Sequence, residues 1–161
     1  MIPRRLVTAS VLLLLAILAS GWWLIQRKRN AARAAILASE THPPELSLCQ
    51  LVADPTRYNG WVVRVRAVYS WGVHGSAIAD NNCSDVDNTT WVDVSPGMRD
   101  EISRVTEKAY GLKGVSGPLH ITAVGRFVEN NPSGRGDSFE ETAPFRFELM
   151  AIENAARADK L

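Results

Sequence analysis

The stretch WVVRVRAVY, residues 61–69, alternates apolar and basic side chains for four positions, 63–66, and then carries an aromatic residue. Successive side chains of a β-strand point to opposite faces, so this pattern predicts a strand with one apolar face. The side chains expected on that face are Trp61, Val63, Val65, Ala67 and Tyr69. The opposite face carries Val62, Arg64, Arg66 and Val68. Such a face is either a binding surface or a sheet face in contact with water, and the rest of the sequence must decide between the two.

Four more segments have the pattern of strands, and one helix separates the third expected strand from the fourth. The later strands are expected at residues 76–80, 89–95, 118–129 and 145–153. The helix is expected to follow Ser95 as its cap, with Pro96 at the first position, and to end before Gly111. Its apolar side chains recur at helical spacing, at Met98, Ile102, Val105 and Ala109.

This order of elements is that of the OB-fold, a five-stranded Greek-key barrel. The sequence therefore predicts a mainly β domain, an OB-like barrel with one helix between strands three and four. Gly125 lies inside the fourth expected strand, where a small barrel needs its sheet to coil tightly. The alternative is an unrelated five-stranded sandwich.

A short helix with Leu48, Leu51 and Val52 on one face is expected before the first strand, ending before Pro55. From here onward the chain resembles a group of uncharacterised bacterial envelope proteins that have a small OB-like domain behind an export segment. The stretches that carry this resemblance are SLCQLVADPTRYNGWVVRVRAVYSWGVHGSAIADNNC, WVDVSP and FELMAIENA. The resemblance covers about residues 45–153. It implies an exported location and a barrel fold, and it carries over no active-site residue.

The N-terminal run LVTASVLLLLAILASGWWLI, residues 6–25, has no charged side chain. A helix needs about 20 such residues to cross the hydrocarbon core of a membrane. Trp22 and Trp23 near its end, and basic residues on both sides, are typical of anchoring at the membrane interfaces. We expect residues 1–29 to form a transmembrane helix or signal segment, residues 30–44 a stalk or linker, and residues 45–161 the globular OB-like domain.

Two alternatives for the N-terminal segment stay open. Small residues at Ala19, Ser20 and Gly21 could form the cleavage site of a signal peptide. The orientation could also be reversed, because more basic residues follow the run than precede it, which favours a cytosolic domain under the positive-inside rule. We favour a single-pass anchor with the domain facing the periplasm or another extracytoplasmic compartment.

The chain has two cysteines, Cys49 and Cys83, both after the apolar run. Two cysteines in an exported domain predict a single disulfide, because oxidising compartments allow such bridges to form and persist. Two unrelated buried thiols are the alternative.

The charge of the chain is uneven. It has 18 basic and 17 acidic residues, but the first 33 positions hold six of the basic residues and no acid. The remainder is therefore acidic, with 12 basic against 17 acidic residues and a net charge of −5. Nucleic-acid binding depends on neutralising phosphates and normally needs a basic domain. An OB module that binds nucleic acid is accordingly the alternative rather than the favoured function.

The arginine face of the first strand is the candidate binding surface, together with nearby aromatic residues. Its members are Arg64, Arg66, Trp61, Tyr69 and Trp71. OB-folds bind oligonucleotides and oligosaccharides on the face of strands two and three and the adjoining loops. The alternative is that these arginines point into water and pair with neighbours such as Glu148.

Other motifs give no site. Asp80, Asp85 and Asp87 share one loop, but the glycine and glutamate that an EF-hand loop requires are missing. The tetrapeptide RGDS, residues 135–138, is short enough to arise by chance. The chain lacks the nucleophile-elbow, zinc-protease, P-loop and Rossmann patterns, so we expect no metal, no cofactor and no catalytic activity.

Together these patterns predict a membrane-anchored extracytoplasmic binding or adaptor domain, with a protein, glycan or peptide as its partner. Membrane contact is expected through the single N-terminal helix. An enzyme whose residues come from scattered loops is a third class, with no motif in its favour.

Overall fold

The computed structural model describes residues 4–72, 75–80, 82–83, 90–113, 117–129 and 143–158. For residues 4–17 and 19 it describes the backbone alone. The chain divides into two compact units, Met1–Leu37 and Ala38–Leu161.

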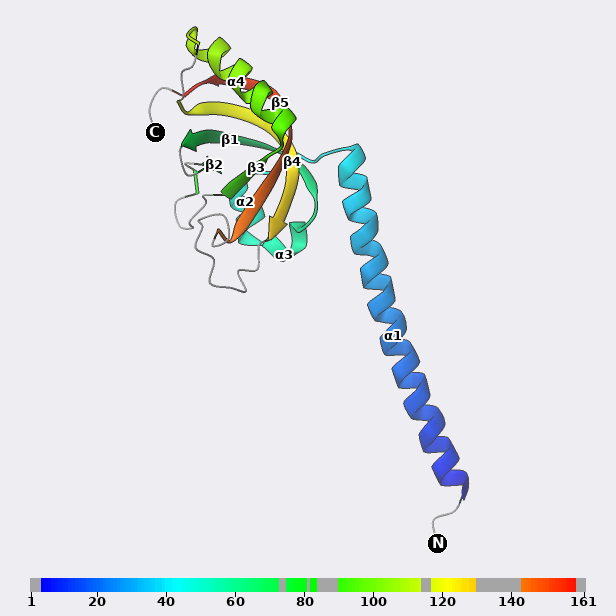
Figure 1. Cartoon of the computed structure of the whole chain (residues 1–161). Coiled ribbons are helices and arrows are strands. Elements are labelled where there is room, and N and C mark those ends of the chain that lie inside the picture. Colours follow the sequence, from blue (N-terminus) through cyan, green and yellow to red (C-terminus); the bar gives the residue numbers. More distant parts are fainter. Residues whose placement is uncertain are drawn as a thin grey trace. The chain divides into compact units, whose positions relative to one another are not determined.

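The first unit is formed by most of helix α1, Arg4–Thr41, drawn at the blue end of the chain in Figure 1. The side chains of Trp22 and Trp23 in this helix are 64% and 59% exposed. The Arg27 guanidinium lies 5.4 Å from the Trp23 ring centroid. Within the described residues, we find no helix that combines the length and apolarity needed to cross a membrane. The predicted membrane segment, residues 6–25, lies largely outside the described side chains.

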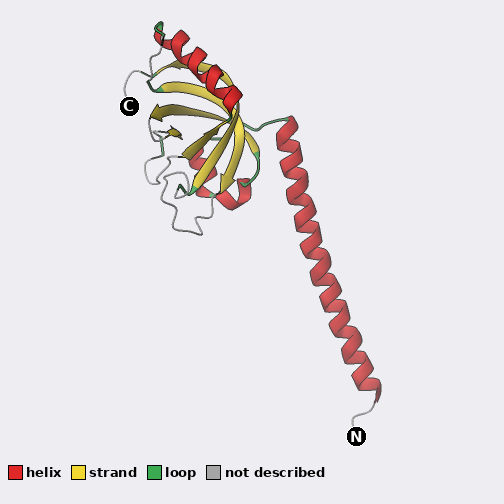
Figure 2. Ribbon diagram, viewed as in Figure 1, coloured by secondary structure: helices red, strands yellow, loops and turns green. Residues whose placement is uncertain are grey.

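The second unit contains a closed barrel of five strands (Figures 1 and 2). The strands are β1 (Val62–Gly72), β2 (Gly75–Ala79), β3 (Thr90–Val94), β4 (Leu119–Glu129) and β5 (Phe145–Arg157). They follow one another around the barrel in the order β1-β2-β3-β5-β4, and β4 pairs with β1 to close it. Neighbours are antiparallel except β3 and β5, which are parallel. The run β4-β1-β2-β3 is a Greek key.

Helix α4, Pro96–Tyr110, lies between β3 and β4, as the sequence predicts. Ile102 on its predicted apolar face is 1% exposed, and Met98, Val105 and Ala109 pack against the same core. Gly111 ends the helix with a left-handed backbone, φ 68°, that glycine adopts without strain. Ser95 is the N-terminal cap residue, but its carbonyl accepts the Met98 and Arg99 N–H groups and its side chain makes no cap bond.

The structure differs from the expected elements at several boundaries. Strand β5 continues to Arg157, four residues past its predicted end, because residues 154–157 pair with β4 although they lack an apolar alternation. A turn of helix, α3 (Pro55–Tyr58), follows directly after the segment expected as the short helix. Helix α2 (Leu48–Ala53) starts with a capping box, in which Ser47 and Gln50 each bond the other's backbone N–H.

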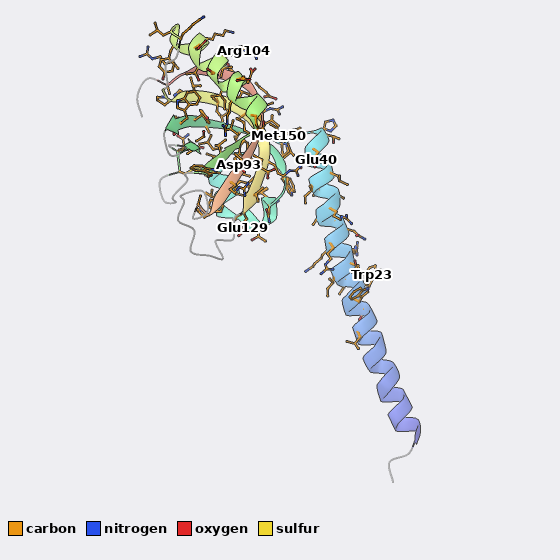
Figure 3. The ribbon with its side chains drawn as sticks, in the orientation of Figure 1. Trp23, Glu40, Asp93, Arg104, Glu129 and Met150 are labelled. Atoms are coloured by element: carbon orange, nitrogen blue, oxygen red, sulfur yellow. A yellow bond between two sulfur atoms is a disulfide. The ribbon has the colours of Figure 1, made fainter. Side chains whose placement is uncertain are left out.

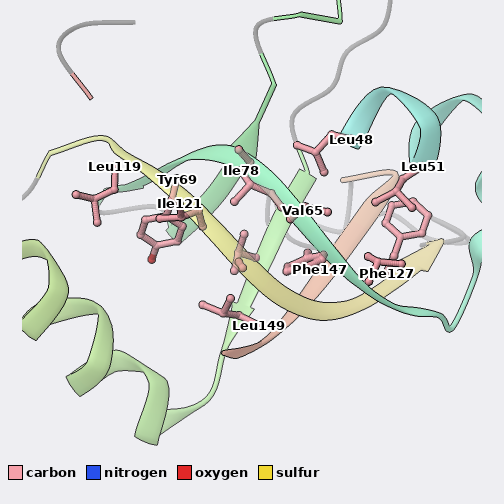
Figure 4. Close-up of a cluster of buried hydrophobic side chains, with 14 of the residues drawn as sticks. Leu48, Leu51, Val65, Tyr69, Ile78, Leu119, Ile121, Phe127, Phe147 and Leu149 are labelled. Carbon is pink, nitrogen blue, oxygen red and sulfur yellow. The ribbon is translucent and has the colours of Figure 1, made fainter. Parts of the chain in front are cut away.

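The barrel core is built from the inward faces of all five strands, with α2 and α4 packed against it (Figure 4). Strand β1 contributes the odd-numbered residues that its pattern predicts: Val63, Val65, Ala67 and Tyr69 are at most 8% exposed. Phe127 of β4 and Phe147 of β5 are fully buried in the same cluster. The prediction of a mainly β, five-stranded closed barrel with one helix between strands three and four is confirmed.

Gly125 marks a place where β4 and β5 approach closely. The register between the two strands shifts at Val124/Gly125, and a Cβ atom on Gly125 would lie 2.6 Å from the Glu148 carbonyl oxygen and against the Phe147 ring. The glycine therefore allows the close approach of the two strands at this register shift.

Candidate functional site

Arg64 is held in place on the outer face of β1. Its Nε donates to Glu153 Oε2 and its Nη2 to Glu153 Oε1, both at 2.7 Å, so the pair is bidentate. Its Nη1 donates to the Pro43 carbonyl at 3.2 Å. The hydrogen bond to Arg64 lowers the pKa of the Glu153 carboxyl, and the same bond raises the pKa of Arg64. A guanidinium engaged on three atoms contributes mainly to the structure of the barrel wall.

Arg66, two residues along, is held far more loosely. Its Nε lies 2.9 Å from Glu45 Oε1, but the two side chains are 74% and 51% exposed. An ion pair this exposed contributes little to stability. The Arg66 guanidinium can therefore turn toward a ligand at small energetic cost.

A continuous basic surface through Arg64, Arg66 and Arg126 is not formed. Arg126 Nη2 bonds Glu40 at 2.8 Å and its Nε lies 3.7 Å from Glu148. Each of the three guanidinium groups thus faces a carboxylate. Glu148, one example of the neighbours expected to pair with the β1 arginines, pairs with Arg126.

The predicted aromatic residues do not join the arginine face. Tyr69 is 2% exposed in the barrel core, where its hydroxyl donates to Ser76 Oγ at 2.9 Å and burial raises its pKa. Trp61 packs edge-on against Tyr58, with ring centroids 5.6 Å apart. Trp71 is 37% exposed near the end of β1. The reason is strand parity: odd-numbered side chains of β1 point to the side opposite Arg64 and Arg66.

A groove of about 540 Å³ lies beside Arg66 on the barrel wall. We call it the β1–β4 groove, because these two strands form its centre, with β2 and β5 at its sides. Its polar lining consists of Arg66, Asp80, Asn82, His120, Thr122 and Asn154. Its apolar lining consists of Ala67, Val68, Ala79, Ile121 and Ala156. This volume is in the range typical of sites for small ligands.

Strand pairing brings the groove residues together. Arg66 is opposite Thr122, Thr122 is opposite Asn154, and Val68 is opposite His120. These positions are adjacent across three strands, so their side chains share one surface. Of the residues named in the sequence as a candidate binding surface, only Arg66 lines the groove. The β5 residues of the groove, Asn154 and Ala156, are placed by the β4–β5 register, which has two shifts and cannot be read from the sequence pattern.

Asp80 forms the inner polar wall of the groove and is 9% exposed. Its Oδ1 accepts the Asn82 backbone N–H at 3.0 Å and the Asn82 Nδ2 at 2.9 Å. Its carbonyl accepts the Cys83 N–H at 3.1 Å. These bonds form a compact turn that fixes the carboxylate at the groove.

The predicted disulfide between Cys49 and Cys83 is confirmed, with 5.4 Å between the two Cα atoms. It ties α2 to the turn that carries Asp80 and Asn82, and so holds one side of the groove. Asp80 Oδ2 lies 3.9 Å from Cys49 Sγ, a grouping that resembles a metal site in its residue types. Cysteine binds a metal as the thiolate, and the two sulfurs are joined to each other here, so Asp80 is left as the one available ligand of this grouping.

Two motifs lie outside the described residues: Asp85 and Asp87 of the acidic loop, and RGDS at 135–138. The loops that border the strand-two and strand-three face of an OB-fold, residues 73–74 and 130–142, lie outside them too. The comparisons with family models, with curated proteins and with solved structures yield no match to this chain.

Proposed function

We propose that this protein is a membrane-anchored, extracytoplasmic binding protein that holds its ligand in the β1–β4 groove and has no catalytic activity of its own. The groove itself is the observation that carries this proposal. It combines a fixed carboxylate, a loosely paired guanidinium, two amides and an imidazole on a rigid closed barrel. Convergent polar groups in a preformed hollow are the usual mark of a binding site.

We assign the barrel to the OB-fold class. Support comes from the Greek-key order of its strands, its closure between β1 and β4, and α4 between β3 and β4. The β1–β4 groove does not lie on the strand-two and strand-three face that OB-folds commonly use.

Anchoring and export are supported by the uncharged run of residues 6–25, and by the basic residues and tryptophans around it. The Cys49–Cys83 bridge adds independent support, because disulfides are rare in cytosolic proteins. We infer that the barrel lies on the oxidising side of the membrane.

Absence of catalysis is supported by the chemistry of the groove. Asp80 is the single carboxylate among the described residues that line it, whereas hydrolysis of a glycoside commonly needs two carboxylates that face one another. Cys83, next to the groove turn, is oxidised and so cannot act as a nucleophile.

Location can be tested on intact cells that produce the full chain with Arg104→Cys. Arg104 lies on α4 and its side chain is 74% exposed (Figure 3), so the new thiol is accessible. A membrane-impermeant maleimide should label it before lysis. Labelling only after lysis would place the barrel in the cytosol and overturn this part of the proposal.

Binding can be tested with the full chain in zwitterionic detergent, by calorimetric titration with short neutral oligosaccharides, an anionic oligosaccharide, single-stranded DNA and short peptides. Ala156→Trp should fill the groove and abolish binding of the ligand. The matched control is Ala151→Trp, since both alanines are exposed on β5 and Ala151 does not line the groove. Binding to no member of the panel, or binding that Ala156→Trp leaves unchanged, would overturn the assignment of the groove.

A further inference from the structure

We infer that the ligand of the β1–β4 groove is a short neutral oligosaccharide, an inference that rests on the proposed binding function. Three features of the groove lead to this class of ligand: its charge, the engagement of its backbone groups, and the chemistry of its side chains.

The charge of the groove argues against a polyanion. Arg66 is the one arginine or lysine among the described residues that line it, and Glu45 lies 2.9 Å from it. Asp80 adds a fixed negative charge at the inner wall. A nucleic acid or acidic glycan would bring phosphates or carboxylates toward this carboxylate with little positive charge to offset them.

The backbone of β4, the strand at the centre of the groove, pairs with a neighbouring strand on each side. The β1–β4 and β4–β5 ladders pair Arg66 with Thr122 and Thr122 with Asn154, so the N–H and C=O groups of the central strand are engaged by its neighbours. An extended peptide usually binds by adding a strand to a free sheet edge, through main-chain hydrogen bonds. The centre of the groove lies on the face of these paired strands, so recognition there comes from side chains.

The side chains suit hydroxyl groups. Each sugar hydroxyl can donate one hydrogen bond and accept two, and the lining offers both acceptors and donors for these bonds. Asp80 accepts; the Arg66 guanidinium donates; Asn82 and Asn154 can do both. Two small apolar side chains in the same lining, Ala79 and Ala156, are half-buried and exposed, respectively, and offer a contact for the C–H face of a sugar ring.

The test titrates the full chain in a zwitterionic detergent, because detergents with maltose or glucose headgroups would compete for the groove. The neutral probes are maltotriose, cellotriose and tri-N-acetylchitotriose. The competing probes are a heparin tetrasaccharide, a ten-residue oligothymidine and trialanine. We expect saturable binding to at least one neutral trisaccharide and none to the charged probes.

Point variants then locate the contact. Asn154→Ala and Arg66→Ala should each weaken trisaccharide binding by about tenfold, the effect of losing roughly one good hydrogen bond. Arg104→Ala is the matched control for Arg66→Ala, because both arginines are 74% exposed and each is in an ion pair with a glutamate. This control should leave affinity unchanged.

The outcomes separate this inference from the proposed function. Binding of trialanine or oligothymidine that Ala156→Trp abolishes would keep the groove as a binding site and overturn the oligosaccharide. Trisaccharide binding that responds equally to Arg66→Ala and Arg104→Ala would show that the contact lies elsewhere, and would overturn the inference for this groove. Failure of the whole panel would overturn both proposals.

Discussion

The guanidinium of Arg64 and the carboxylate of Glu153 form two parallel hydrogen bonds, each 2.7 Å long, from β1 to β5. The two side chains are 31% and 41% exposed, and β4 lies between their strands in the barrel wall. Glu153 lies between the β5 residues that pair with Thr122 and Ala123, where the register shifts, so this ion pair fixes a position at which the ladder itself is irregular.

Stability in acid should depend on this pair. Because Arg64 lowers the pKa of Glu153 in the folded state, the carboxyl contributes stability above the usual glutamate pKa of about 4.3. This contribution is lost as the pH falls below that value through the folded-state pKa. In Glu153→Gln the free energy of unfolding, measured with urea, should therefore decrease less between pH 5 and 3 than it does in the wild type.

Glu45→Gln provides the comparison, because it removes the carboxylate partner of the other β1 arginine. The two side chains of that pair are 74% and 51% exposed, so removing the pair should matter little. The loss of stability of this variant between pH 5 and 3 should therefore equal that of the wild type. Equal flattening in both variants would contradict a specific role for Glu153.

The Cys49–Cys83 bridge should stabilise the second unit by restricting the unfolded chain. With a sequence separation of 34, the chain-entropy relation gives about 4 kcal/mol at 25 °C. The double variant Cys49→Ser/Cys83→Ser should lose about this much in urea unfolding. Dithiothreitol should lower the stability of the wild type to that of the double variant and leave the variant itself unchanged. Wild-type stability that does not respond to the reductant would argue against the bridge in solution.

The sequence predicts the faces of single elements well, because each face is set by a local period. Val63 and Val65 of β1 and Ile102 of α4 lie in the core where their spacing places them. Gly125 and Gly111 also lie where close approach or a left-handed backbone requires glycine. These features depend on neighbours within one strand or one turn.

The groove could not be predicted in this way. It depends on which β4 residue lies opposite Arg66 and on which β5 residue lies opposite that one. The register between β4 and β5 shifts at two places. The polar end of β5, which carries Asn154, has no alternation that would mark it as a strand. The partner of Arg64 is likewise 89 positions away in the chain, so Glu153 could not be chosen from spacing alone.

Gly125→Ala should destabilise the barrel. Its Cβ would meet the Glu148 carbonyl oxygen, a backbone atom that can move only if β5 moves with it. Overpacking of this kind costs about 1–3 kcal/mol, which urea unfolding can measure.

Gly97→Ala is the matched control, because no atom lies within 4 Å of the position of its added Cβ and the residue is in the first turn of α4. It should be neutral or stabilise the protein by up to about 1 kcal/mol. Equal effects of the two substitutions would show that β5 accommodates the methyl group.

Ser39 connects the last turn of α1 to the start of β1 within the second unit. Its Oγ is the acceptor for the Val62 N–H at 3.0 Å, and the residue is 3% exposed. Ser39→Ala leaves that buried N–H without this acceptor, and such a loss costs about 1–3 kcal/mol. Thr41→Ala removes a hydroxyl from the same turn, but that hydroxyl donates to the Ala38 carbonyl at an exposed site. Water can replace this second bond, so the control should change stability by less than about 0.5 kcal/mol. We expect slow amide hydrogen exchange at Val62 in the wild type and in Thr41→Ala, and fast exchange in Ser39→Ala. This result would attribute the loss of stability to the single bond between Val62 and Ser39. Exchange at Val62 that is equally slow in both variants would contradict it.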